Sequence, residues 1–156
     1  MNRVDAFVDL QSLLAEYWAS VDRIGDTQQS SASFYVEAGE MVLGSLHVKG
    51  RDNIAAFFAS RNAKEIANRR STRHFTANFR LRALRDERVT VHALVVAYAG
   101  CGDWPLSSQP PSAVGDFSFS CVHDPAHGWR FEKVTATSVF VSPGAASFAK
   151  GSRPDT

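Results

Sequence analysis

The segment from Arg70 to Asn78, with the sequence RSTRHFTAN, carries polar side chains at alternate positions. Successive side chains of a strand point to opposite faces, so His74, Thr76 and Asn78 share one face and Phe75 points to the other. An imidazole can take up and release a proton near neutral pH. This polar face is therefore either solvated or lines a cavity in which these groups meet a ligand.

A second polar group of interest lies in the first predicted helix, which spans about Val4 to Arg23. Apolar residues recur there at spacings of three and four, and Tyr17 belongs to the apolar stripe. Asp22 follows five residues later, about 140° further round the helix, where it would ordinarily face solvent. A carboxylate near a helix C-terminus is mildly unfavourable to the helix dipole, so Asp22 occupies a disfavoured position.

The remaining elements follow from turn residues and side-chain periodicity. In chain order we expect a short helix through Phe34 and Tyr35, a strand or tight hairpin over 41–48, a third helix with Asp52 as its N-cap, long strands over 71–84 and 89–100, and a hairpin over 117–123 and 129–141. Prolines place a long loop over 101–115, which we interpret as a lid or an interaction surface.

Helices come first and a mainly antiparallel sheet follows, an order that predicts the α+β class. A chain of 156 residues is most simply one domain, so we assign 1–156 to a single domain. Its core is expected over about 5–142. The polar stretch 143–156, rich in small residues, is expected to be a flexible tail.

Composition excludes several classes of partner. The net charge of +1 gives no reason to expect nucleic acid or an anionic membrane as a partner. No apolar run approaches the ~20 residues that span a bilayer. The N-terminus lacks the apolar core of a signal peptide, so we expect a cytoplasmic location. The five histidines are scattered and the two cysteines lack metal-site spacing, so we expect no metal and no cofactor.

Three motifs make the chain resemble the SnoaL-like branch of the NTF2-like superfamily, which includes polyketide cyclases, scytalone dehydratase and bile-acid dehydratases. The motifs are EYWASVDRIGD (16–26), GRDNIAAFF (50–58) and TRHFTAN (72–78). The resemblance covers roughly residues 5–142 in the order and spacing of the elements. The resemblance implies an NTF2-like cone, in which a strongly curved sheet wraps the N-terminal helices and encloses a deep, largely apolar pocket.

The resemblance also implies an acid/base site. Dehydratases of this family use a His on the matching strand, an Asp near the end of helix one and Tyr residues in the pocket, which correspond to His74, Asp22 and Tyr17. The next strand supplies a second polar group, for which Tyr98 and His92 are the candidates. The register of the hairpin that carries them stays open, because a one-residue slip moves every side chain to the other face.

The chemistry of these groups agrees with that resemblance. A carboxylate that fixes the imidazole tautomer lets a His–Asp pair act as a general base, and a Tyr hydroxyl can polarise a carbonyl. We therefore expect a cofactor-free lyase or isomerase, of dehydratase type, that acts on a hydrophobic cyclic ketone or hydroxyl compound. The expected catalytic residues are His74, Asp22, Tyr17 and Tyr98, and the expected substrate-binding residues are Asn78, Trp18, Phe57, Phe58 and His92.

Each of these residues also has a structural interpretation. His74 could be hydrogen-bonded to helix one without any reaction, and Tyr17 could be ordinary core. The alternative function is a non-catalytic binding protein or a partner subunit that resembles the beta subunit of a ring-hydroxylating dioxygenase. Phe75, Phe79 and Leu81 predict an apolar outer sheet face, and with it a homodimer packed sheet to sheet.

Overall fold

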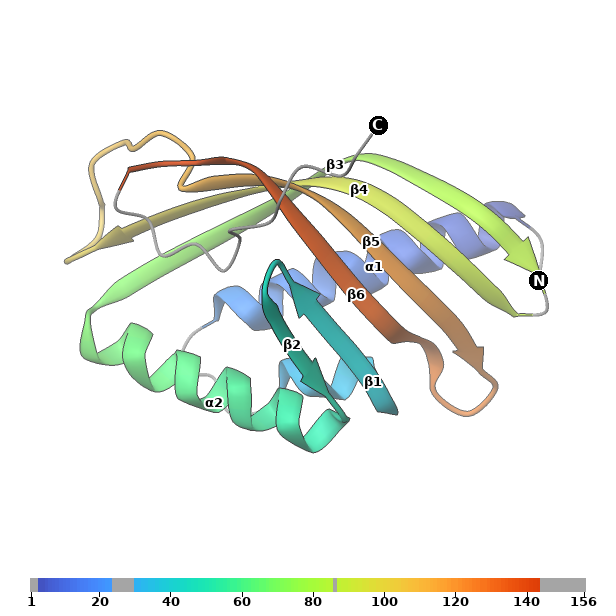
Figure 1. Ribbon diagram of the computed structural model, residues 1–156. Coiled ribbons are helices and arrows are strands. Elements are labelled where there is room, and N and C mark those ends of the chain that lie inside the picture. The colour runs from blue at the N-terminus through green and yellow to red at the C-terminus, as the bar shows by residue number, and fades with distance from the viewer. Residues whose placement is uncertain (1–2, 24–29, 86, 144–156) are drawn as a thin grey trace.

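The computed structural model describes residues 3–23, 30–85 and 87–143, so most of the predicted tail lies outside the described residues. Its elements are the helices α1 (Arg3–Asp22), η1 (Ser31–Phe34) and α2 (Arg51–Ala67), and the strands β1 (Tyr35–Leu43), β2 (Leu46–Lys49), β3 (Arg70–Arg85), β4 (Arg88–Cys101), β5 (Ala113–Asp124) and β6 (Gly128–Val141). Figure 1 shows them in this order, and they confirm the predicted α+β class.

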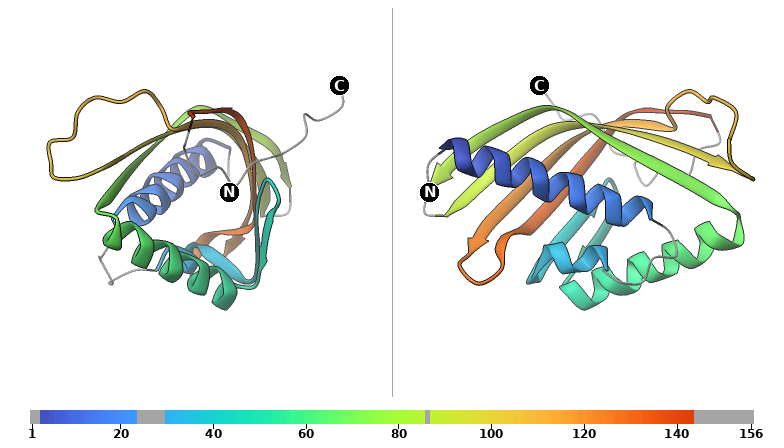
Figure 2. Two further views of the ribbon diagram at one scale, coloured as in Figure 1. Left: turned by 60° about the vertical axis from the view of Figure 1, so that its left-hand side comes forward. Right: turned by 180° about the vertical axis from the view of Figure 1, so that it is seen from behind.

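One curved sheet of six strands forms the wall of the molecule, in the order β2-β1-β6-β5-β4-β3. The strands pair antiparallel except β1 and β6, which run parallel, so the sheet is mainly antiparallel as predicted. Figure 2 shows α1 lying along the concave side of this wall while α2 runs beneath its open side. The sheet therefore wraps the helices instead of stacking flat against them.

Both long helices follow from their sequence patterns, with one difference. On α1 the buried side chains include Leu10, Leu14, Tyr17 and Val21, which is the predicted spacing of three and four. On α2 the N-cap is Gly50, with φ of 87° and no side-chain capping bond, so the prediction of Asp52 as the cap was wrong. Asp52 lies in the first turn instead, where its negative charge suits the positive end of the helix dipole.

The core is one cluster of buried residues that runs along α1 from Ala6 to Val21. At one end of it the N-terminal half of α1 packs against the later part of β3, where the rings of Phe7 and Phe79 meet edge to face at 5.1 Å. Leu10, Phe119 and Phe131 are completely buried in the same cluster. The opposite end, where α1 finishes and β3 begins, is the end that holds the polar side chains discussed below.

Candidate active site

The site is built on the first half of β3, whose inner face carries Thr72, His74 and Thr76. The alternation then changes at Asn78, which has φ of 52° at a break in the pairing between β3 and β4. Such a bulge inserts one residue and reverses the faces beyond it. Asn78 is consequently exposed, while Phe79 and Leu81 turn inward, so the predictions of Asn78 in the pocket and of Phe79 and Leu81 outside were wrong.

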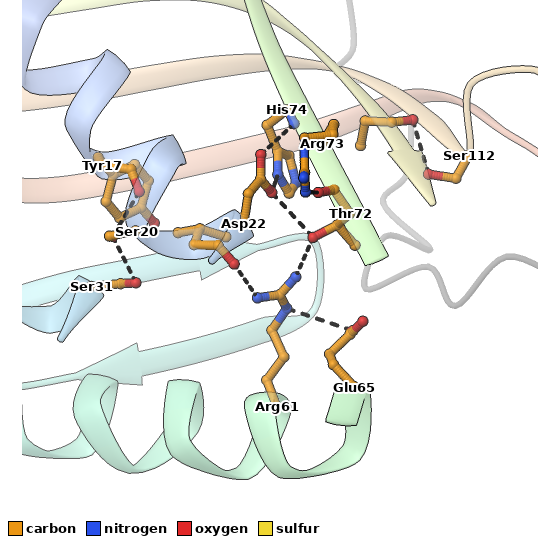
Figure 3. A network of polar contacts seen from close by, with 12 residues as sticks. Tyr17, Ser20, Asp22, Ser31, Arg61, Glu65, Thr72, Arg73, His74 and Ser112 are labelled. Atoms are coloured by element: carbon orange, nitrogen blue, oxygen red, sulfur yellow. Dashed lines mark hydrogen bonds and ion pairs between the residues drawn. The ribbon is translucent and has the colours of Figure 1, made fainter. Parts of the chain in front are cut away.

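His74 and Asp22 meet inside the cone, as Figure 3 shows. The distance from His74 Nδ1 to Asp22 Oδ1 is 2.6 Å, and both side chains are largely buried, with exposed fractions of 15% and 10%. Because a carboxylate accepts hydrogen bonds, Nδ1 carries the proton and neutral His74 keeps a lone pair on Nε2. The sequence-based pairing of these two residues is therefore present in the structure.

Asp22 is the last residue of α1, and β3 explains why a carboxylate occupies that position. Three donors from β3 reach it: His74 Nδ1, the backbone N–H of His74 at 2.7 Å from Oδ2, and the Thr72 hydroxyl at 3.1 Å from Oδ1. Charge-assisted bonds of this kind are about twice as strong as neutral ones. They outweigh the small unfavourable interaction with the helix dipole.

Aromatic side chains of α1 complete the surroundings of His74. The Trp18 ring stacks on the imidazole at 4.4 Å, with an interplanar angle of 15°. Tyr17 lies in hydrogen-bond contact with Tyr35, their hydroxyl oxygens 3.1 Å apart. Burial raises the pKa of Tyr17 from 10.0 to about 12, so its hydroxyl stays protonated and able to donate at neutral pH.

Tyr17, Trp18 and His74 line a cavity of about 220 Å³. Its wall combines apolar and polar side chains from both helices and the sheet: Tyr17, Trp18, Val21, Met41, Leu43, Gly44, Phe57, Phe58, Arg61, Glu65, Arg70, Thr72, His74, Val95, Ala97, Ser112, Ala113, Gly115, Phe117, Ala136 and Ser138. The predicted pocket residues Trp18, Phe57 and Phe58 are therefore among its lining. Asp22 lies behind His74 and is not part of the wall.

Tyr98 and His92 lie on the outer face of the sheet, so the prediction that one of them would face the pocket was wrong. Tyr98 pairs with Arg73 and contacts the Phe75 ring at 5.7 Å, and His92 pairs with Arg80. Two irregularities in the β3–β4 ladder shift the register on the way from the turn, so that His74 faces Ala97. Tyr98 and His92 are an even number of positions apart on β4, so their side chains share one face of the sheet, and both lie outside the pocket.

Sequence reasoning missed a chain of charged residues beside the site. Arg61 on α2 donates to Thr72 Oγ1 at 3.1 Å, and Glu65, one turn later, accepts from Arg70 at 2.6 Å (Figure 3 shows Arg61, Glu65 and Thr72). The available signal was that Arg61 and Glu65 continue the buried spacing set by Ile54 and Phe58. Charges on an apolar stripe indicate a buried polar network.

Within the described part of the chain, no group of three or more His, Cys, Asp or Glu side chains is arranged to hold a metal ion. Neither described long helix is both long and apolar enough to cross a membrane.

The sequence profile of the SnoaL-like domain matches residues 2–135. This chain belongs to the SnoaL-like domain family. No curated protein sequence matches it significantly.

Solved structures agree on the fold. ActVI-ORFA from Streptomyces coelicolor is 16% identical with a TM-score of 0.75, over 90% of this chain and 99% of that one. A protein described as a candidate scytalone dehydratase, from Novosphingobium aromaticivorans, is 15% identical with a TM-score of 0.71, over 96% of each chain. An NTF2-like protein with a cystatin-like fold, from the same species, is 23% identical with a TM-score of 0.67, over 88% and 84%. At these identities the likeness establishes the NTF2-like fold alone.

Proposed function

We propose that this SnoaL-like protein is a cofactor-free lyase or isomerase, of dehydratase type, that acts on a small hydrophobic ring compound. Membership of the family supports a role in processing small molecules. The observation that carries the finer proposal is the His74–Asp22 pair at 2.6 Å, with His74 in the wall of a largely apolar cavity and Asp22 behind it. A buried carboxylate behind an imidazole is the arrangement that makes a general base.

The proposed reaction begins at Nε2 of His74, which makes no hydrogen bond within the described residues. Nε2 takes a proton from the carbon next to a carbonyl, and the electron pair of that C–H bond moves onto the carbonyl oxygen. Asp22 stabilises the imidazolium that forms. The imidazolium then returns its proton, either to a departing hydroxide with loss of water or to another carbon with isomerisation.

Tyr17 is the proposed donor to the developing oxyanion. Its hydroxyl bonds only Tyr35 among the described residues, and Tyr35 is fully buried outside the cavity wall. If Tyr35 donates its proton to the Tyr17 oxygen, both buried groups are satisfied and the Tyr17 proton is free for a ligand. Desolvation also raises the pKa of Tyr35 well above 10.0, which keeps that donor protonated.

The size of the cavity limits the substrate. An apolar cavity of about 150 Å³ accommodates one benzene molecule. A space of about 220 Å³ therefore suits one substituted ring or a small fused pair. Polar groups along one side, including Ser112 and Ser138, suit a ligand with a carbonyl or hydroxyl group.

Proton exchange with solvent tests the proposal without a known substrate. A panel of one- and two-ring cyclic ketones is incubated with the protein in deuterium oxide, and deuterium entry next to the carbonyl is followed by NMR. We expect protein-dependent exchange for part of the panel, lost in His74→Ala and Asp22→Asn variants that keep the wild-type circular dichroism. Equal exchange in wild type and His74→Ala would contradict the role of His74.

The alternative is a non-catalytic binding protein or partner subunit, and the surface that bears on a partner is the outer face of the sheet. Phe75, Val96, Val114 and Phe140 pair in a line across β3, β4, β5 and β6, here called the outer row. Phe75 and Phe140 are 57% and 68% exposed, so the outer row is an exposed apolar surface that suits contact with a protein partner. We propose a second copy of this chain as that partner. Ligand binding in the cavity without any proton exchange would favour the non-catalytic function.

A further inference from the structure

Arg61 is a buried cation in the wall of the cavity, where it joins three elements. Its side chain is only 14% exposed. Its Nη1 donates to the backbone carbonyl of Val21 at 2.9 Å, and its Nη2 donates to Thr72 Oγ1 at 3.1 Å. Its Nε lies 3.8 Å from Glu65 Oε1. A guanidinium is buried at a cost in solvation, which partners of this kind offset.

The direction of each hydrogen bond follows from the chemistry of Arg61. A guanidinium donates and never accepts, so Thr72 Oγ1 must accept from Arg61. The single proton of the Thr72 hydroxyl is then directed to Asp22 Oδ1, 3.1 Å away. Arg61 therefore fixes the rotation of a hydroxyl group that would otherwise be free to turn.

The fixed hydroxyl in turn determines how Asp22 meets His74. Oδ1 accepts from Thr72 and from His74 Nδ1, and Oδ2 accepts from the backbone N–H of His74. Two of these three donors hold the carboxylate against the strand independently of the imidazole. The ring thus meets an acceptor whose position is already set, and only the Nδ1–H form of the neutral imidazole fits it.

The charged groups around Asp22 are mostly basic. Arg61 and Glu65 approach from α2, and Arg70 and Arg73 from β3, with Arg23 and Arg69 beside the same hollow. Burial lowers the pKa of Arg61, and the carboxylates of Glu65 and Asp22 raise it again. The bond to Val21 gives Arg61 a structural task at the end of α1, but that task does not require the second bond, to Thr72.

We propose that Arg61, acting through Thr72, is a positioning residue that fixes the Asp22 carboxylate and thereby the reactive tautomer of His74. The inference rests on the proposed function of His74 as a base. Neither Arg61 nor Thr72 needs to touch the substrate for this role. Their effect reaches the reaction through the nitrogen of His74 that carries the proton.

The imidazole ¹⁵N resonances of His74 test the proposal, because they report which ring nitrogen is protonated. Spectra are recorded on the full chain at a pH where the ring is neutral. We expect a single Nδ1–H form in wild type and in Thr72→Ser, which keeps the hydroxyl. In Arg61→Met and in Thr72→Val the carboxylate still accepts, but Oδ1 loses the fixed hydroxyl that holds it in place. We therefore expect the carboxylate to move off Nδ1 part of the time and the single form to give way to a mixture of the two tautomers. The Arg61→Met/Thr72→Val double variant should resemble Thr72→Val alone.

Arg70→Met is the matched control, because Arg70 also contacts Glu65 but makes no bond to Thr72 in the structure. It should keep the wild-type tautomer. A merely structural Arg61 would lower the melting temperature and leave the His74 resonances unchanged, which would overturn the proposal. A change in Arg61→Met with none in Thr72→Val would also overturn it. If Arg61→Met fails to fold, the Thr72→Val and Thr72→Ser pair still decides whether the hydroxyl fixes the tautomer. These spectra need no substrate, so they can fail independently of the exchange assay.

Discussion

Replacing Asp22 with Asn should stop His74 from acting as a base, because the substitution changes which ring nitrogen carries the proton. The carboxylate has two acceptor oxygens, and the Asn amide has one acceptor and one donor of nearly the same shape. Oδ2 of Asp22 faces the backbone N–H of His74, and Oδ1 faces His74 Nδ1 and the Thr72 hydroxyl. A backbone N–H cannot change its polarity, so the Asn oxygen must take the Oδ2 position.

The Asn NH₂ then faces His74 Nδ1, which can adjust only by giving up its proton and accepting. The proton moves to Nε2, the nitrogen proposed to act as the base, and the lone pair needed for proton abstraction is lost. In serine proteases the corresponding Asp→Asn change leaves the geometry intact and lowers kcat by about 10⁴ through the wrong tautomer. We expect a loss of about 10³- to 10⁴-fold here for the same reason.

Stability should fall much less, by about 1–3 kcal/mol, since charge-assisted hydrogen bonds become neutral ones while the shape is kept. The assay pairs solvent deuterium exchange, for activity, with ¹⁵N spectra of His74 and thermal unfolding monitored by circular dichroism. Asp22→Asn should show the Nε2–H form and a folded protein. An Asp22→Asn variant that keeps the Nδ1–H form and exchanges within a few-fold of wild type would refute the reasoning.

Three further predictions follow from the Tyr pair, the outer row and the bulge. Tyr17→Phe should lower the exchange rate by about 10²-fold, as loss of one oxyanion donor does, and should weaken folding by about 1–3 kcal/mol because Tyr35 loses its partner. Folding raises the pKa of Tyr17 from 10.0 to about 12, so the neutral hydroxyl stabilises the folded state fully below pH 10. This stabilisation is lost as the pH rises towards 12, and Tyr17→Phe should reduce that loss in alkaline unfolding curves. Phe140→Glu should turn a wild-type dimer into a monomer in sedimentation, unlike Ser45→Glu at the exposed turn between β1 and β2, and a monomeric wild type at micromolar concentration would exclude the dimer. Asn78→Gly should leave the free energy of unfolding within about 0.5 kcal/mol, whereas Asn78→Val should cost about 1–2 kcal/mol because of its positive φ; equal costs in chemical denaturation would contradict the strained bulge.

Local patterns were sufficient for the order of the elements but not for the central pair of the site. Strand alternation put His74 on a polar face that could be solvated or line a cavity, and the charge of Asp22 stood in a disfavoured position. Both inferences depend on residues within a few positions of each other in sequence. The resemblance to SnoaL-like proteins then joined them across 52 residues, a separation that the structure closes to 2.6 Å.

What could not be predicted depends on register and on burial of charge. Tyr98 was misplaced because the register of the β3–β4 hairpin could not be fixed from a single sequence, in which bulges leave little trace: the ladder starts with Arg85 opposite Arg88 and sets His74 opposite Ala97, which leaves Tyr98 on the outer face. Asn78 itself was misread as one more residue of an alternating strand, although Asn tolerates positive φ better than most residues. Arg61 was passed over because its position on α2 suggested packing, and its partners come from α1 and β3.

The bulge at Asn78 has a consequence for how such a protein can evolve. Before it, β3 presents side chains to the cavity; after it, the same strand presents Phe79 and Leu81 to the closed end of the cone. On β3 the residues that face the cavity and the residues that join the core beside Phe7 therefore lie on different segments of the strand. A substitution at Thr72 can reshape the cavity while the contact between Phe7 and Phe79 stays in place. This one strand can thus change a cavity-facing residue without losing its contact with the N-terminal half of α1.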